Sequence, residues 1–186
     1  MTLNLHTIIV STRPSRKGPL VARWFHDYAV ANGKFNASLV DLAEFDLPVF
    51  DEPEHPRLRK YVNEHTRRWS ASVEAADAFV FVTPEYNYGP PPSFLNAMSY
   101  LSGEWAYKPA GFVSYGGIYG GLRAVQIEKL TMTTLKIMPI PEAVTVPLFA
   151  QHIKDGVFEP TEMMVDGAKN VLSELYRWAE ALKALR

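Results

Sequence analysis

Short apolar segments alternate with longer amphipathic segments along the whole chain. In the longer segments apolar residues recur every three or four positions, which is typical of helices packed on one face. The pattern predicts strands over 3–10, 35–42, 78–83, 111–115 and 143–147, and helices over 19–31, 58–76, 94–101, 121–137 and 164–185. Parallel strands need long connections and a cover on both faces, so the pattern predicts an α/β fold with an open, doubly wound parallel sheet.

The segment from Ala78 to Thr83 is the clearest strand. It is continuously apolar up to its threonine, as expected for a strand that is covered on both faces, so we expect it to be central. Ligands of such sheets bind beyond the carboxyl ends of the strands. The residues that follow the first, third and fourth predicted strands are therefore the candidates for a site.

Composition narrows the class of protein. A chain of 186 residues without a linker, repeat or low-complexity tract predicts a single domain over residues 1–186. Nineteen basic and twenty acidic residues give a net charge of −1, which favours neither nucleic acid nor an anionic membrane as a partner. The sequence has no cysteine, no apolar run near the ~20 residues that span a bilayer, and no secretory signal at its start. We expect a cytoplasmic protein whose partners are small molecules or proteins.

The first candidate loop, Ser11 to Gly18, has the composition of a phosphate site. Its hydroxyl and backbone N–H groups can donate to phosphate oxygens, its basic side chains can neutralise charge, and a predicted helix begins directly after it. The dinucleotide and P-loop glycine motifs are absent, so a monophosphate is expected. The alternative is an ordinary polar loop with a capping serine. The candidate ligands are Ser11, Arg13, Ser15, Arg16, Lys17 and Gly18.

The second candidate loop places two tyrosines around an amide between prolines. Proline limits the freedom of the backbone, so the N–H and C=O groups of the residues between the prolines can be held ready for the edge of a planar ring. The tyrosines can stack on the face of such a ring. The alternative is a rigid turn whose tyrosines pack on a neighbour. The candidates are Pro84, Glu85, Tyr86, Asn87 and Tyr88.

The third candidate loop follows the fourth predicted strand and is rich in glycine. Glycine lets the backbone approach a flat ligand without a side chain in between. The alternative is a flexible loop that leads into a helix cap. The candidates are Ser114, Tyr115, Gly116 and Gly117.

Motifs in these three loops resemble those of the NADPH-dependent FMN reductases, flavodoxin-like proteins that include quinone, chromate and azo-dye reductases. The resemblance covers nearly the whole chain. It rests on Ser11-Thr12-Arg13-Pro14, on Thr83-Pro84-Glu85-Tyr86-Asn87-Tyr88 with Leu95-Asn96-Ala97, and on Ser114-Tyr115-Gly116-Gly117 with Gly120-Gly121-Leu122-Arg123. The chain departs from the family pattern at Val10, Gly89, Leu95 and Ser99, where glycine, serine, lysine and aspartate are frequent.

The resemblance implies a three-layer α/β/α sandwich with strand order 2-1-3-4-5. It also implies that the first loop holds the phosphate of FMN, that residues 84–88 and 114–117 hold the isoalloxazine ring, and that the protein is a homodimer or homotetramer. The implied activity is hydride transfer from NADPH or NADH to FMN and then to a quinone, azo, metal-oxyanion or free-flavin acceptor.

Such a reaction needs no essential acid or base from the protein, because the cofactor carries the difficult chemistry. We therefore expect no catalytic side chain, while backbone amides near Gly116 and Gly117 or the loop from Pro84 stabilise charge on the flavin. The five histidines form no metal motif, so no metal site is expected. A flavodoxin-type electron carrier, and a phosphate-ester enzyme or nucleotide-binding module that uses the first loop alone, remain as alternatives.

Overall fold

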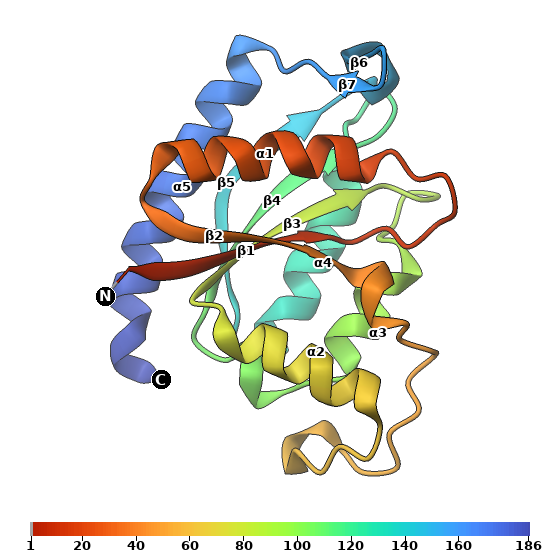
Figure 1. Ribbon diagram of the computed structural model, residues 1–186, viewed down its shortest axis with the longest axis vertical. Coiled ribbons are helices and arrows are strands. Elements are labelled where there is room, and N and C mark those ends of the chain that lie inside the picture. The colour runs from red at the N-terminus through yellow and green to blue at the C-terminus, as the bar shows by residue number, and fades with distance from the viewer. Residues whose placement is uncertain (1) are drawn as a thin grey trace.

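A parallel sheet of five strands forms the centre of the computed structural model, which describes residues 2–186 (Figure 1). The strand order is β2-β1-β3-β4-β5, so the predicted order is confirmed. The strands are β1 (Leu3–Ile9), β2 (Phe35–Asp41), β3 (Ala78–Pro84), β4 (Pro109–Tyr115) and β5 (Met138–Val146). The helices are α1 (Gly18–Asn32), α2 (Glu64–Ala75), α3 (Pro92–Ser99), α4 (Leu122–Thr134) and α5 (Glu162–Leu182).

Helices cover both faces of the sheet and give it three layers. Helices α1 and α5 pack on one face, and α2, α3 and α4 pack on the other. The predicted flavodoxin-like α/β/α sandwich is therefore confirmed. None of the helices within residues 2–186 is both long enough and apolar enough to cross a membrane.

Every residue of β3 is buried, as expected for the central strand. Its side chains alternate between two apolar cores, with Val80 and Val82 facing α1 and α5 and with Phe79 and Phe81 facing the other layer. Burying a side chain of this size stabilises the fold by about 1.5–3 kcal/mol. The continuous apolar run of β3 thus reflects burial on both sides.

Two predicted helices have the wrong limits. The segment 58–76 was expected to be one helix, but a 3-10 turn (Pro56–Leu58) ends at Arg59, whose φ of 52° is left-handed, and α2 begins only at Glu64. The predicted helix 121–137 ends at Thr134 because Lys136 also has a left-handed backbone, with φ of 58°. Both breaks come from single backbone conformations that side-chain periodicity does not reveal.

Strand β5 is longer than the predicted 143–147, since it begins at Met138. Pro139 and Pro141 argue against a strand in the sequence, but β5 lies at the edge of the sheet, where a residue without an N–H is tolerated. The N–H of Met138 donates to the Lys108 carbonyl oxygen at 3.1 Å on the β4 side. Since the backbone N–H groups of successive strand residues point to opposite edges, the ring nitrogen of Pro139 faces the free edge.

A small hairpin after β5 was not predicted. Strands β6 (Ile153–Lys154) and β7 (Val157–Phe158) pair antiparallel, and β7 contacts α1. The connecting Asp155 and Gly156 have φ of 48° and 79°, as a two-residue hairpin turn requires. The Asp-Gly pair in the sequence is the signal that could have revealed it.

Candidate functional site

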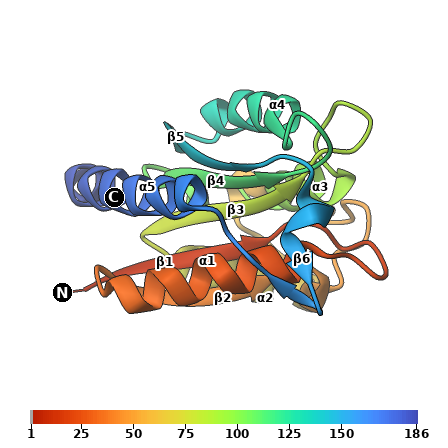
Figure 2. The same cartoon turned by 90° about the horizontal axis from the view of Figure 1, so that it is seen from above.

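The loops that follow β1 and β3 lie at the same edge of the molecule (Figure 2). The hydroxyl groups of Ser11 and Tyr86 are 2.7 Å apart and form a hydrogen bond between these two loops. Ser11 is fully buried. Strands β1 and β3 are parallel neighbours, so their carboxyl ends bring together residues that are 75 positions apart in sequence. Tyr86, which was expected to offer a stacking face, therefore also ties the first loop to the second.

Glu85 joins the second loop to the third. Its backbone N–H donates to the Tyr115 carbonyl oxygen at 3.2 Å. Its carboxylate accepts two hydrogen bonds from Arg123, one from the backbone N–H at 3.1 Å and one from guanidinium Nη1 at 2.7 Å. Arg123 lies in the first turn of α4, where a carboxylate is favoured by the helix dipole.

Tyr115 and Gly18 bring the third loop against the first. A Cβ added to Gly18 would lie 2.4 Å from the Tyr115 hydroxyl oxygen, so the close approach requires glycine at this position. Burial raises the pKa of the Tyr115 hydroxyl above its usual value, and this group stays protonated at neutral pH. Together these contacts connect all three predicted loops to one another.

The first loop has unused capacity to bind an anion. Lys17 precedes α1 without capping it through its side chain, and the first turn of α1 contains no acidic residue. Within residues 2–186 the Arg13 guanidinium has no ion-pair or hydrogen-bond partner, and its side chain is exposed. Arg16 differs, because it forms an ion pair with Asp41 at the end of β2, while its Nε is buried without a partner. Among the described residues, the charge of Arg13 is therefore free to bind a phosphate, whereas the charge of Arg16 is already paired with Asp41.

A tight turn projects Asn87 and Tyr88 from the second loop. The backbones of Tyr86 and Gly89 exchange two hydrogen bonds of 2.9 Å, and the two residues between them have φ of 49° and 68°. This is the geometry of a type I′ turn, which asparagine tolerates well and a bulky residue does not. Tyr88 is nevertheless 69% exposed, so no burial of its ring offsets the strained backbone.

The Arg123 guanidinium lies between two tyrosine rings. Its central carbon is 3.8 Å from the centroid of the Tyr88 ring and 3.9 Å from that of the Tyr119 ring. These are close cation–π contacts that join the second and third loops a second time. Sequence reasoning gave Arg123 no role of its own, although it belongs to the Gly-Gly-Leu-Arg motif.

In the third loop the two candidate amides are not equivalent. The Gly116 N–H donates to the Val146 carbonyl oxygen at 3.3 Å, whereas the Gly117 N–H has no partner in residues 2–186. A Cβ added to Gly117 would meet nothing within 4 Å, so the space beside it is open. The carbonyl groups of both residues accept from the segment after β5, at 3.1 Å from Phe149 and 2.8 Å from Leu148. Gly117 thus combines a fixed backbone with a free donor.

A buried acid lies beneath this edge and was missed in the sequence. Glu128 in α4 is completely buried and accepts a hydrogen bond of 2.6 Å from the Thr83 hydroxyl. Burial raises the pKa of Glu128 to about 8, so its carboxyl group is mainly protonated at neutral pH. The helical spacing of Val125, Glu128 and Met132 on one buried face is the signal that could have revealed it.

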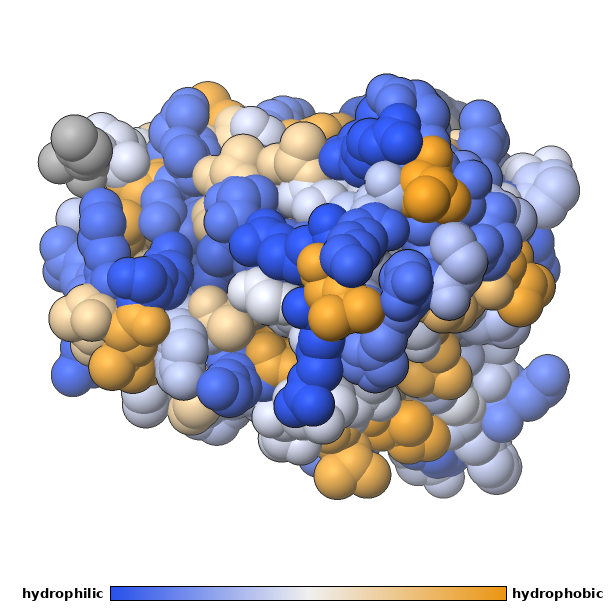
Figure 3. All heavy atoms as spheres, turned by 90° about the horizontal axis from the view of Figure 1, so that it is seen from below, coloured by the Kyte–Doolittle hydropathy of each residue, from blue (hydrophilic) through white to orange (hydrophobic). Residues whose placement is uncertain are grey.

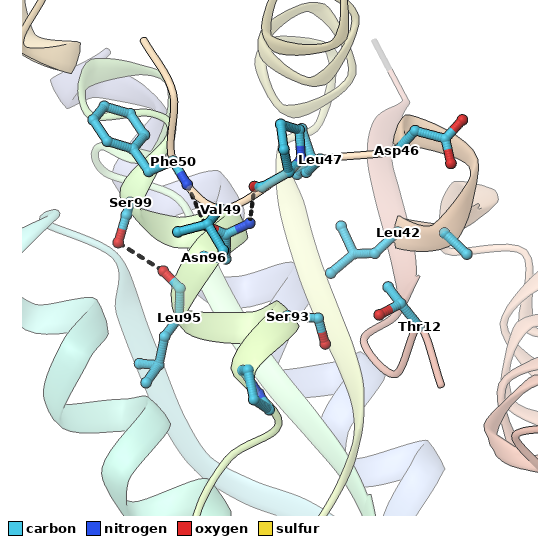
Figure 4. A pocket seen from close by; sticks show the side chains of 13 residues that line it. Thr12, Leu42, Asp46, Leu47, Val49, Phe50, Ser93, Leu95, Asn96 and Ser99 are labelled. Atoms are coloured by element: carbon cyan, nitrogen blue, oxygen red, sulfur yellow. Dashed lines mark hydrogen bonds between the residues drawn. The ribbon is translucent and has the colours of Figure 1, made fainter. Parts of the chain in front are cut away.

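A cavity of about 820 Å³ adjoins the first loop at Thr12 and is otherwise lined by residues of α3 and of the segment 42–50 (Figure 4). None of the predicted ligand residues lines it. Asn96 on its wall donates to the Pro48 carbonyl oxygen at 2.6 Å and accepts from the Phe50 N–H at 3.0 Å. Asn96, which belongs to the Leu95-Asn96-Ala97 motif, therefore holds the segment between β2 and α2 in place. Residues 2–186 contain no cluster of three side chains suited to bind a metal.

Comparison with known proteins gives a consistent result. The sequence model of the family described as NADPH-dependent FMN reductase matches residues 3–151. The NAD(P)H-dependent FMN reductase C4B3.06c of Schizosaccharomyces pombe is 36% identical over 163 residues, which cover 86% of this chain and 80% of that protein. The quinone reductase of Escherichia coli K12 is 33% identical over 128 residues, covering 65% of this chain and 64% of that protein.

The fold has solved counterparts. The flavoenzyme NAD(P)H:(acceptor) oxidoreductase FerB from Paracoccus denitrificans superposes with a TM-score of 0.73 at 19% identity. The superposition covers 96% of this chain and 98% of FerB.

Proposed function

The chain belongs to the NADPH-dependent FMN reductase family, and on that premise we propose that it is an FMN-dependent oxidoreductase that draws electrons from NAD(P)H. The observation that carries the proposal is the joining of three loops at one edge. The first loop contributes the charge of Arg13, which is unpaired within residues 2–186, and the third loop contributes the open backbone at Gly117. We propose the whole chain, residues 1–186, as the single domain that does this.

The first loop is proposed to hold the phosphate of FMN. Arg13 and the uncapped start of α1 supply unused donors, and the charge of Arg16 is shared with Asp41. Phosphate oxygens favour charged and backbone donors of this kind. The proposed ligands are Ser11, Arg13, Ser15, Arg16, Lys17 and Gly18.

The second and third loops are proposed to hold the flavin ring. Residues 84–88 and 114–117 contribute a tight turn with an exposed amide side chain and a backbone N–H at Gly117 that lacks a partner. A preorganised backbone donor is suited to an oxygen on which negative charge develops. The open space beside Gly117 is the observation that favours a flat group there.

FMN, when bound, supplies the ability to take a hydride from NAD(P)H and to pass electrons on. The protein is proposed to bind, orient and shield the reacting groups. Tyr115 and Glu128 stay neutral at the base of the site and add no charge to it, since burial raises the pKa of each. We assign no acid or base to a side chain.

A quinone is the acceptor that we propose first. A quinone reductase is among the relatives with about one third of aligned residues identical. An azo compound, a metal oxyanion or free flavin would need the same electron supply. Measuring NAD(P)H oxidation with each acceptor in turn distinguishes these alternatives from a quinone.

We also propose that the protein assembles as a homodimer or homotetramer. Leu95 on α3 and Ile127 and Leu130 on the neighbouring α4 are exposed apolar side chains. Figure 3 shows apolar side chains in several groups among hydrophilic ones on the face seen from below. Light scattering of the purified protein measures the number of chains, and a monomer at high concentration would contradict this assembly.

The test of the proposed function is uptake of FMN followed by turnover. Purified protein is incubated with excess FMN, desalted and examined for flavin absorption, with riboflavin as the matched ligand that lacks the phosphate. We expect one FMN per chain, weaker retention of riboflavin, and oxidation of NADPH or NADH when a quinone is added. Failure to retain FMN would contradict the proposal. Retention without oxidation of either nucleotide would identify an electron carrier instead.

A further inference from the structure

Tyr88, Arg123 and Tyr119 form a short column of three flat groups. The central carbon of the guanidinium lies over both rings, 3.8 Å and 3.9 Å from their centroids, which are close cation–π distances. Glu85 holds the guanidinium by its edge through Nη1 and holds the Arg123 backbone as well. The two tyrosine rings are therefore held against a fixed group.

The outer faces of this column are open. Arg123 covers the inner face of each ring, yet Tyr88 is 69% and Tyr119 is 57% exposed. Aromatic rings exposed to this degree add little to the stability of the fold, since they bury little area. Tyr88 also has a strained left-handed backbone, with φ of 68°. Strain of this kind, without burial in return, is typical of functional positions.

The column belongs to the two loops proposed for the flavin ring. Tyr88 follows Asn87 directly, and Tyr119 lies two residues after Gly117. A second substrate that exchanges electrons with the flavin ring has to reach the same edge. The column is thus a stacking surface beside the proposed site of reaction.

We infer that the outer faces of the Tyr88–Arg123–Tyr119 column bind a flat ring of the reducing nucleotide NAD(P)H, with Arg123 as the positioning residue. This inference rests on the proposed function. NAD(P)H carries two flat rings, the dihydronicotinamide and the aromatic adenine, and both stack on tyrosine without needing a specific hydrogen bond. The inference requires no reacting group from the column.

The charge of the column indicates how it recognises the nucleotide. Glu85 neutralises Arg123 at 2.7 Å, so the pair presents no net charge to the extra phosphate that distinguishes NADPH from NADH. Recognition by this column is then by ring stacking. We expect changes in the column to affect NADPH and NADH to the same degree.

The test measures binding of oxidised nucleotide to FMN-loaded protein by calorimetry. Tyr119→Leu removes one ring, Tyr119→Phe keeps it, and Arg123→Lys keeps the charge but loses the flat group. The matched control is Tyr107→Leu, because Tyr107 also contacts a cation, Lys136, but precedes β4 at the opposite end of the strand. Urea unfolding of each variant confirms that it is folded.

We expect Tyr119→Leu to weaken NADP⁺ binding about threefold to tenfold, the range that one aromatic pair contributes. The KM for NADPH should rise similarly with little change in kcat, and Arg123→Lys should act in the same direction. Tyr119→Phe and Tyr107→Leu should match the wild type. Nicotinamide mononucleotide separates the two rings: equal weakening identifies nicotinamide, and an effect on NADP⁺ alone identifies adenine.

Unchanged NADP⁺ affinity in Tyr119→Leu and Arg123→Lys would overturn the inference, as would a rise in KM for the quinone alone. Either result leaves the proposed function standing, because FMN retention is measured separately on the same samples. A wild-type protein that retains no FMN would instead remove the proposed function itself.

Discussion

Arg123 donates to Glu85 from two points, its backbone N–H and its guanidinium. The Glu85 side chain is only 11% exposed, so neither donor would regain full solvation if the carboxylate were removed. We expect Glu85→Ala to lower the free energy of unfolding by about 1–3 kcal/mol. Urea unfolding measures this change. Glu159→Ala, which breaks an exposed ion pair with Lys154, is the control and should cost under about 1 kcal/mol. Equal effects of the two substitutions would mean that the Glu85 contact contributes no more than a surface pair.

Arg13 and Arg16 should differ in how much they contribute to the affinity for FMN. Arg13 has no partner within the described chain and Arg16 is paired with Asp41. A charge-assisted contact to phosphate contributes about 1.5–3 kcal/mol, so Arg13→Ala should weaken FMN binding about tenfold or more. Fluorescence titration of the apoprotein measures the affinity. Riboflavin, which lacks the phosphate, should bind the variant and the wild type alike, and full retention of FMN would place the phosphate elsewhere.

Asn87 combines a side-chain role with a backbone requirement. Its φ of 49° is left-handed, so Asn87→Ala removes the amide and also strains the turn by about 1 kcal/mol. Asn87→Gly removes the same amide without strain. We expect both variants to bind FMN more weakly and only the alanine variant to lose stability in urea. If glycine restored FMN binding, the amide would have no part in holding the ring.

Gly117 offers a substitution that should affect binding without affecting folding. A Cβ there meets nothing within 4 Å, so Gly117→Ala should change the free energy of unfolding by less than about 0.5 kcal/mol. The added methyl group would nevertheless occupy the space proposed for the flavin ring and lower FMN affinity. Gly103→Ala is the control, because its Cβ is equally unobstructed in a turn before β4. Unaltered FMN affinity in Gly117→Ala would place the ring away from this backbone.

Glu128 should make stability depend on pH. Burial raises its pKa from 4.5 to about 8, so the folded state holds a proton that the unfolded state releases above pH 4.5. Its favourable contribution is complete below pH 4.5 and is lost as the pH rises to about 8. Urea unfolding of wild type and Glu128→Gln at intervals from pH 4.5 to 9 measures this. We expect the free energy of unfolding of the glutamine variant to rise relative to that of the wild type up to about pH 8, and the difference then to level off. Parallel pH profiles would show that the carboxyl group titrates normally.

Hydrophobic periodicity predicted the sheet well because it records burial directly. The unbroken apolar run of β3 placed that strand at the centre, and the convergence of the strand ends brought the loops together. The predicted ends of two helices were wrong because a single backbone angle ends the helical segment, as at Arg59 and Lys136. The predicted start of β5 was wrong because its position at the edge of the sheet overrides the low strand propensity of proline, as at Pro139.

The contacts within the site could not be predicted in the same way. Ser11 and Tyr86 are 75 residues apart, and Arg16 and Asp41 are 25 apart. Each pairing depends on the register of two strands and on the exact course of a loop, which composition does not contain. The sequence therefore indicated which loops meet at the edge, but not which of their side chains already form hydrogen bonds or ion pairs with one another.

Pro139 has a consequence for how copies of this protein can meet. Its ring nitrogen faces outward from the edge strand β5, so a strand from another molecule would find a position without a donor. Such an edge resists joining sheets into a continuous ribbon, and it protects the protein from strand-mediated aggregation along that side. Association at this edge is therefore expected to use side-chain packing in preference to strand pairing, which keeps each sheet a separate unit.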